Sequence, residues 1–108
     1  LAAGQYLVVG ADVLGAGLPG GTLFVGAGIK NIIQNGNPDG MHLDCAIGRL
    51  DGLHYGGTIP GVGEGAKPPS DPDIGSIGRC PNGSDTDENS LDFVTALTAT
   101  PGLPNICD

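Results

Sequence analysis

Apolar residues in this 108-residue chain come in short runs that glycine, proline or asparagine interrupt. No window of about eleven residues carries the 3.6-residue spacing of an amphipathic helix without a glycine or proline inside it. Short β-prone runs between turn residues are typical of strands. The pattern therefore predicts short strands and no helix of ordinary length. The expected strands are residues 5–9, 22–25, 41–46, 49–55, 74–79 and 92–97.

The clearest hairpin lies in the middle of the chain. The runs 41–46 and 49–55 flank Ile47-Gly48, and the turn sequence Asn37-Pro38-Asp39-Gly40 comes just before them. We expect the two runs to pair with each other.

Long segments rich in glycine and proline separate the expected strands. Residues 10–21 and 56–73 predict surface loops, and residues 98–108 predict a turn-rich tail. Strands at short spacing with such turns are typical of sandwiches and barrels. We therefore expect one all-β domain over residues 1–108.

The charge balance argues against several classes of partner. The chain has 4 Lys and Arg residues against 12 Asp and Glu residues, which gives a net charge of −8. So few cations cannot neutralise a phosphate backbone, and nucleic acid is therefore a poor partner. An anionic membrane surface is disfavoured for the same reason. No apolar run approaches the roughly 20 residues that span a bilayer, so no membrane insertion is predicted.

No motif in the sequence indicates catalysis or a cofactor. Gly15–Gly20 fits the G-x-G-x-x-G spacing, but a dinucleotide site needs a helix there, whereas an expected strand follows at Thr22. Ser76 lacks the flanking pattern of a nucleophile elbow. His42 and His54 have no acid or cysteine at metal-ligand spacing, which favours ordinary strand histidines. We predict that the chain is not an enzyme.

An acidic turn near the end of the chain has part of a calcium-loop pattern. Residues 85–89 (DTDEN) match the opening D-x-D-x-N, and alternate oxygens of this kind suit Ca²⁺. Ser90 and Ala96 stand where an EF-hand has glycine and glutamate, so the turn is not an EF-hand. A weak calcium site and a solvated turn both remain open. The candidate ligands are Asp85, Asp87, Asn89 and Asp92.

Six short segments occur in a fixed order along nearly the whole chain. They are residues 1–9 (LAAGQYLVV), 33–43 (IQNGNPDGMHL), 53–57 (LHYGG), 76–83 (SIGRCPNG), 85–93 (DTDENSLDF) and 100–105 (TPGLPN). Together they resemble the lamin tail domain family in its bacterial secreted form.

This resemblance implies an immunoglobulin-like β-sandwich that serves binding or scaffolding and has no active site of its own. Such domains often accompany nucleases, adhesion modules or surface anchors in secreted bacterial proteins. We therefore expect a structural or adhesive module in an extracellular or cell-surface location. The alternatives are an appendage of a larger secreted enzyme, such as a nuclease, and a calcium-dependent ligand-binding domain.

The resemblance is incomplete at the front of the chain. Family members usually begin with two or three further strands, and the start at Leu1 suggests a processed or partial chain. A sandwich without those strands has unpaired edges that invite another strand. We expect another segment or subunit to complete the fold. Repeated head-to-tail contacts of this kind would build a filament or surface structure.

Three cysteines and one glycosylation motif fit a secreted protein. Cys45, Cys80 and Cys107 form no C-x-x-C pair, so a zinc ribbon is disfavoured. In an oxidising compartment we expect two to pair, because a small core gains from a disulfide. The alternative is three buried or unpaired thiols. Our first choice is Cys45 with Cys80, since both flank expected strands, although Cys107 lies in a tail that could reach either. Asn82-Gly83-Ser84 fits the N-glycosylation rule and indicates a surface turn.

Overall fold

The computed structural model describes residues 1–29, 33, 36–68, 70 and 74–107. The chain divides into two compact units. Unit 1 comprises Leu1–Gln34 and Thr100–Pro104, and unit 2 comprises Asn35–Ala99 and Asn105–Asp108.

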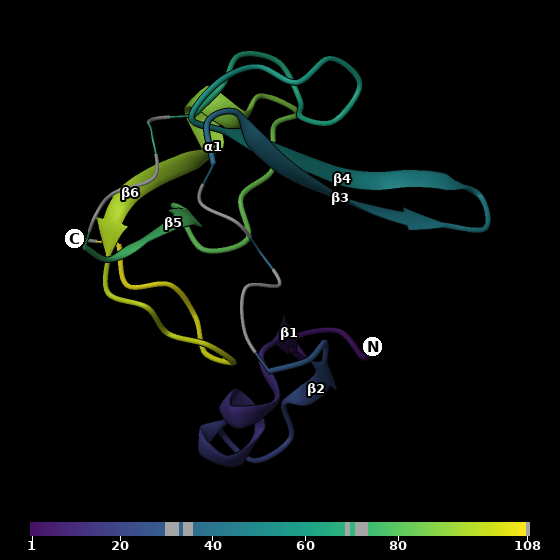
Figure 1. The fold of residues 1–108 in the computed structure, drawn as a ribbon, viewed down its shortest axis with the longest axis vertical. Helices are drawn as coiled ribbons and strands as arrows, with labels where there is room; N and C mark the ends of the chain where they lie inside the picture. Colours follow the sequence, from purple (N-terminus) through teal and green to yellow (C-terminus); the bar gives the residue numbers. More distant parts are fainter. Residues whose placement is uncertain (30–32, 34–35, 69, 71–73, 108) are drawn as a thin grey trace. The chain divides into compact units, whose positions relative to one another are not determined.

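Unit 1 contains two parallel strands joined by a 3₁₀ helix. β1 spans Leu7–Gly10, η1 spans Asp12–Gly17 and β2 spans Leu23–Gly26 (Figure 1). Both strands lie where the sequence predicts them, within one or two residues. The sequence predicts a plain loop over 10–21, where the structure has η1. A parallel pair needs a crossover connection, because the chain must return to the same end of the sheet, and η1 forms part of that return.

The predicted hairpin is confirmed in unit 2. β3 (Asp39–Cys45) pairs with β4 (Gly48–Tyr55) in antiparallel fashion, and the turn between them lies at Ala46 and Ile47. Gly48 has a φ of 130°, which favours glycine at this position. In Figure 1 the hairpin extends as a long arm from the part of unit 2 that contains α1.

A second antiparallel pair completes the regular structure of unit 2. β5 (Ser76–Arg79) pairs with β6 (Phe93–Leu97), and the single-turn helix α1 (Asn89–Asp92) leads directly into β6. The sequence predicts both strands. Asp92, expected as the first residue of the second strand, belongs to α1 instead. Among the described residues, no helix has the length and apolar character needed to cross a membrane.

The expected loop over 56–73 and tail over 98–108 have no helix or strand in their described residues. Residues 69, 71–73 and 108 lie outside the described part of these segments. The described strands form three sheets of two strands each, which confirms a β-rich chain. An immunoglobulin-like sandwich has two larger sheets, so that finer expectation stays a prediction.

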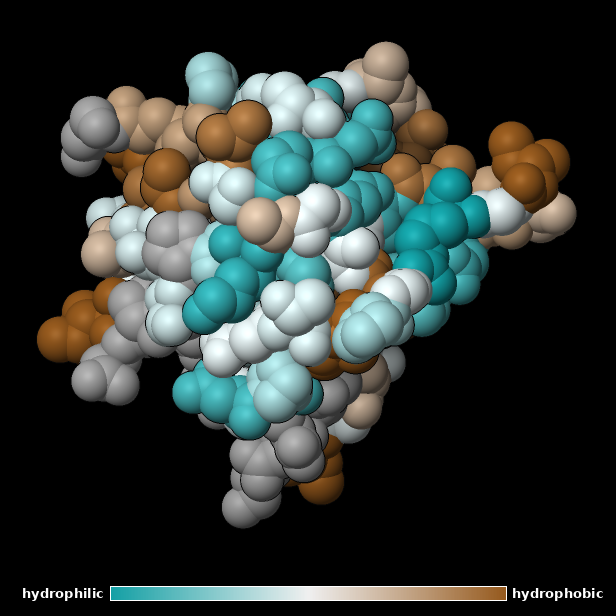
Figure 2. Space-filling view, turned by 90° about the horizontal axis from the view of Figure 1, so that it is seen from above, coloured by the Kyte–Doolittle hydropathy of each residue, from teal (hydrophilic) through white to brown (hydrophobic). Residues whose placement is uncertain are grey.

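Little apolar surface is buried within the described residues. Apart from Pro68, Tyr55 is their only buried apolar side chain, with 6% of its surface exposed. Many leucines, isoleucines and valines are exposed instead, and Figure 2 shows apolar residues at several places on the surface it presents. The buried polar side chains belong to His54, Asn89 and Asp92. Polar interactions therefore contribute an unusually large share of the packing in unit 2.

Candidate functional site

A group of polar side chains, most of them buried or half-buried, lies where two loops of unit 2 meet β4 and β5. The loop before β5 contributes Glu64, and the segment from Asp85 through α1 contributes most of the other groups. The residues with polar side chains in this group are Asp51, Glu64, Arg79, Asp85, Asn89 and Asp92. We refer to the four acids and Arg79 as the Arg79 cluster, and we treat Asn89 separately.

Asn89 joins β4 to the loop that carries Glu64. Its side-chain amide nitrogen donates to the carbonyl of Gly52 at 2.9 Å. Its side-chain oxygen accepts from the backbone N–H groups of His54 at 3.3 Å and Glu64 at 3.0 Å. The backbone N–H of Asn89 also donates to the Glu64 carbonyl at 2.9 Å. Gly52 and His54 are two residues apart in β4, so their backbone groups point to the same edge of that strand. Asn89 therefore pairs with backbone hydrogen-bonding groups on this edge, as a neighbouring strand would.

Arg79 forms the centre of the cluster that bears its name. Its Nη2 lies 2.7 Å from Asp51, and its Nη1 lies 3.1 Å from both Asp85 and Asp92. Nη1 also donates to the Ser84 carbonyl at 2.8 Å. Only 11% of the side chain is exposed. Burial by itself lowers the pKa of Arg79, but the carboxylates of Asp51 and Asp85 outweigh it and raise that pKa.

Stacking adds a further contact to this arginine. The guanidinium carbon lies 4.5 Å from the centre of the Phe93 ring, at the start of β6. A cation over an aromatic face is attracted by the ring quadrupole. Arg79 is therefore held by carboxylates, a carbonyl and a ring, which fixes β5 against the loops around it.

Asp92 is the most deeply buried acid of the cluster, with 1% of its side chain exposed. Its oxygens accept hydrogen bonds from the Thr86 N–H at 2.9 Å and the Thr86 hydroxyl at 2.8 Å, besides the contact with Arg79. The Thr86 N–H is the main reason that the pKa of Asp92 is lowered, and the Thr86 hydroxyl and Arg79 add to it. The carboxylate is therefore charged at neutral pH and organises the turn before α1.

The negative charge of Glu64 has fewer stabilising contacts than the charges of the other acids in the cluster. Burial, followed by the nearby charges of Asp51 and Asp85, raises the pKa of Glu64. Its carboxylate lies 3.9 Å from Nη2 of Arg79, which opposes this shift. Its Oε2 is buried and has no hydrogen-bond partner among the described residues. The cluster therefore carries one carboxylate whose charged form is disfavoured.

Three acids of the cluster have the spacing of a metal-binding group. Carboxylate oxygens of Asp51, Glu64 and Asp85 all lie within 4.8 Å of one another. Sequence patterns do not predict this grouping, because the three residues belong to separate segments that come together only in the folded chain. Arg79 contacts or approaches all three, so its guanidinium already supplies the positive charge that a cation would provide.

The structure places the four predicted calcium ligands differently from one another. The side-chain oxygens of Asn89 and Asp92 are engaged in the hydrogen bonds described above. Asp85 contacts Arg79 and accepts from the N–H of Asp87 at 3.3 Å. Of the four, only Asp85 belongs to the described group of acids with metal-ligand spacing.

The structure pairs Cys80 with Cys107, so the first choice of Cys45 with Cys80 is wrong. Cys45 is exposed and free at the end of β3, whereas the tail returns to β5 and brings Cys107 beside Cys80. The Asn105 side chain assists this return by donating to the Arg79 carbonyl at 3.0 Å. The glycosylation candidate Asn82 is exposed, and its side-chain oxygen accepts from the N–H of Asn105 at 2.7 Å.

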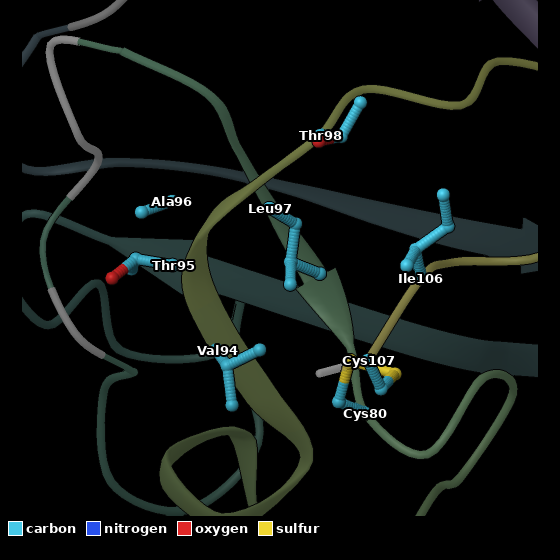
Figure 3. A pocket seen from close by; sticks show the side chains of 8 residues that line it. All are labelled: Cys80, Val94, Thr95, Ala96, Leu97, Thr98, Ile106 and Cys107. Carbon is cyan, nitrogen blue, oxygen red and sulfur yellow. A yellow bond between two sulfur atoms is a disulfide. The ribbon is translucent and has the colours of Figure 1, made fainter.

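A shallow cavity of about 360 Å³ lies beside the disulfide. Figure 3 shows Val94 and Leu97 of β6 on the same side as Ile106 and the disulfide, with Thr95 on the other side of the strand. The lining residues are Cys80, Val94, Thr95, Ala96, Leu97, Thr98, Ile106 and Cys107. None of these side chains titrates near neutral pH, so the cavity offers apolar contacts and hydroxyl groups.

The two histidines lie in different environments. His42 is exposed and its Nε2 lies 3.2 Å from Asp44. His54 is buried with 1% of its surface exposed, and its Nδ1 accepts from the N–H of Ile59 at 3.3 Å. The described metal-like group contains neither of them.

Comparison with known proteins returns no relative. No family model matches the sequence, and no curated protein or solved structure matches the chain. A function for this chain must therefore be inferred from its own residues.

Proposed function

We propose that this chain is a non-catalytic extracellular module with a structural, adhesive or scaffolding role, and that strands of another protein segment complete its β-sandwich. One observation carries the proposal. Strands with exposed apolar side chains form sheets of only two strands, and Tyr55 is nearly alone as a buried apolar residue among those described. Strands need larger sheets or a covering layer to be stable in water.

The chemistry of the polar cluster supports a structural role. Arg79 forms ion pairs with Asp51, Asp85 and Asp92. Asn89 makes its side-chain hydrogen bonds with backbone groups of β4 and the neighbouring loop. Groups used in this way position loops and strands. The same side chains are then not free to bind or activate a substrate.

The disulfide supports an extracellular or cell-surface location. Cys80 and Cys107 are bonded in the structure, and structural disulfides persist mainly in oxidising compartments. An appendage of a larger secreted enzyme would share this property. In either setting the partner is another protein segment, and repeated complementation would build a surface or filament structure.

Amide hydrogen exchange on the dilute chain tests the proposal. We expect protection around α1 and β5, where Asn89, Arg79 and the disulfide act, and fast exchange along β1 and β2. The Cys45→Ser variant serves as the reference, because it removes intermolecular oxidation. A monomer that melts cooperatively and has protected amides along every strand would show that the fold is self-sufficient, and the proposal would fail.

A further inference from the structure

The turn after β5 contains an exposed asparagine that is followed by a glycine. The backbone N–H of Ser84 donates to the carbonyl of Pro81 at 2.9 Å. This bond closes a β-turn with Asn82 and Gly83 as its two central residues. Gly83 has a φ of 73°, which suits glycine at the third position of such a turn. Both central residues are exposed, so the turn presents an Asn-Gly bond to solvent.

A backbone donor from the tail contacts the carboxamide of Asn82. The N–H of Asn105 donates to the Oδ1 of Asn82 at 2.7 Å. The tail is kept in this place by the Asn105 side chain, which donates to the Arg79 carbonyl, and by the disulfide of Cys107. A donor on a carbonyl oxygen stabilises the oxyanion that forms when a nucleophile adds to the carbonyl carbon. The Cγ atom of Asn82 is therefore polarised toward nucleophilic attack.

The backbone nitrogen of Gly83 is the nucleophile nearest to this carbon along the chain. Its attack on Cγ of Asn82 closes a five-membered ring, and glycine has no Cβ atom to hinder the approach. The space around Gly83 is open, because a Cβ atom built there would meet no described residue within 4 Å, its chain neighbours apart. Water can therefore reach the ring once it has formed.

We propose that Asn82 is a site of spontaneous deamidation in the folded chain. The Gly83 nitrogen bonds to Cγ of Asn82 and gives up its proton, the bond from Cγ to Nδ2 breaks, and Nδ2 leaves as ammonia. Water then opens the cyclic imide at either of its two carbonyls, which leaves aspartate or isoaspartate at position 82. One water is consumed and one ammonia is released, and the reaction needs no oxidant or reductant. This inference is independent of the proposed function.

The other asparagines with described side chains each lack one of these features. Asn37 precedes Pro38, whose nitrogen has no proton to lose. Asn89 is fully buried, and three hydrogen bonds hold its carboxamide. Asn105 precedes the β-branched Ile106, whose side chain hinders attack by the backbone nitrogen. We therefore expect the reaction at Asn82 and not at these three positions.

Conversion changes the turn and its contact with the tail. Aspartate adds one negative charge to a chain of net charge −8 and keeps an oxygen for the Asn105 N–H. Isoaspartate adds one atom to the main chain before Gly83, so the hydrogen bond between Ser84 and Pro81 loses its normal geometry. Either product lacks the amide nitrogen that N-glycosylation requires. The reaction therefore alters the turn beside the disulfide and removes the glycosylation candidate.

Peptide mapping of the full chain, made in a host without N-glycosylation, tests the proposal. After incubation in mildly alkaline buffer, the peptide with residue 82 should gain the mass difference between an amide and a carboxylic acid and should contain isoaspartate. In Gly83→Ala both signals should fall to background, because the methyl group hinders ring closure although it has room in the turn. The control Ser84→Ala removes the glycosylation motif, keeps the Asn-Gly bond and should convert like the parent.

The same incubation in urea separates the effect of the structure from the reactivity of an unfolded chain. Unfolding removes the Asn105 donor, so Asn82 of the folded chain should convert at least as fast as Asn82 in urea. A folded-state rate at least about tenfold lower would show that the hydrogen bond holds the carboxamide away from Gly83, and would overturn the proposal. An unchanged peptide in both states, or equal conversion of the parent and Gly83→Ala, would overturn it as well.

Discussion

The side chain of Asn89 donates a 2.9 Å hydrogen bond to the carbonyl of Gly52, although 37 residues separate the two in sequence. The same side chain accepts from His54 and Glu64, and none of its surface is exposed. One buried amide therefore takes the place of a neighbouring strand along part of β4. A chain that buries few apolar side chains depends on such hydrogen bonds for its unique structure.

Replacement of Asn89 by alanine should lower the free energy of unfolding by about 3 kcal/mol or more, because it leaves buried backbone groups of β4 and the loop unpaired. Leu91→Ala is the matched control, since Leu91 is an exposed neighbour in α1 and should change stability by less than about 0.5 kcal/mol. Urea unfolding at neutral pH measures both. Equal midpoints for the two variants would contradict the role assigned to Asn89.

Arg79→Gln should lower the free energy of unfolding by about 3 kcal/mol, because it removes the positive partner of the buried Asp92 and of Asp51 and Asp85. The control is Arg49→Gln. Arg49 is 36% exposed and pairs with Asp44 on the hairpin, so its loss should cost at most about 1 kcal/mol. Urea unfolding compares the two. A larger loss for Arg49→Gln would show that the Arg79 cluster does not hold unit 2 together.

Calcium should stabilise the Arg79→Gln variant more than the parent chain. The variant leaves Asp51, Glu64 and Asp85 together without the guanidinium, and these oxygens then need another cation. Thermal unfolding with millimolar Ca²⁺, against Mg²⁺ as control, measures the stabilisation expected for a ligand that binds only the folded state.

Calorimetry of the parent chain with and without Asp87→Ala tests calcium binding at the acidic turn itself. Binding there should be weak at most, because Asn89 and Asp92 use their oxygens in hydrogen bonds. Tight binding that Asp87→Ala abolishes would assign the site to the turn and not to the group around Arg79.

Loss of the disulfide through Cys80→Ser should cost about 3.5 kcal/mol, as the entropy model gives for a loop of this length. Cys45→Ser should leave stability nearly unchanged, because Cys45 is exposed and unpaired. Peptide mapping without reduction should find Cys80 linked to Cys107. A peptide that links Cys45 to Cys80, or three free thiols in native protein, would contradict the structure.

Local patterns predicted the strands well, because strands and turns depend on neighbouring residues. The hairpin around Ile47-Gly48 and the strands that became β5 and β6 follow from apolar runs between glycine and proline turns. Features that depend on contacts between residues far apart in sequence were harder to predict. The pairing of Cys107 with Cys80 depends on the path of the tail, which no short-range pattern describes.

The polar cluster shows the same division between local and long-range information. The acidic spacing of the turn from Asp85 to Asp92 indicated a candidate calcium loop, but the partners of that turn are Arg79, Asp51 and Glu64 in other segments. Only the folded chain shows that an arginine lies among these acids. Asp85 and Asp92 belong both to the expected calcium loop and to the observed ion-pair cluster. In the structure Arg79, and not a metal ion, is the cation that pairs with them.

Glu64→Gln should raise the free energy of unfolding at neutral pH. The pKa of Glu64 is raised above its ordinary value of 4.5, chiefly by burial. Between the ordinary and the raised value the folded chain binds more protons than the unfolded chain, so stability falls as pH rises through that window. Glutamine does not titrate and avoids this loss. The gain over the parent should therefore vanish below the ordinary pKa, where Glu64 is protonated in both states.

Glu88→Gln is the matched control, because it should behave in the opposite way. The hydrogen bond from the Ser90 hydroxyl is the main cause that lowers the pKa of Glu88, and the Ala66 N–H adds to it. A lowered pKa contributes stability above the ordinary value and loses it as pH falls through the folded value. Glu88→Gln should thus be less stable than the parent at neutral pH and approach it in acid. Urea unfolding between about pH 3 and pH 8 measures both variants, and a Glu64→Gln variant that is less stable than the parent at neutral pH would contradict the raised pKa.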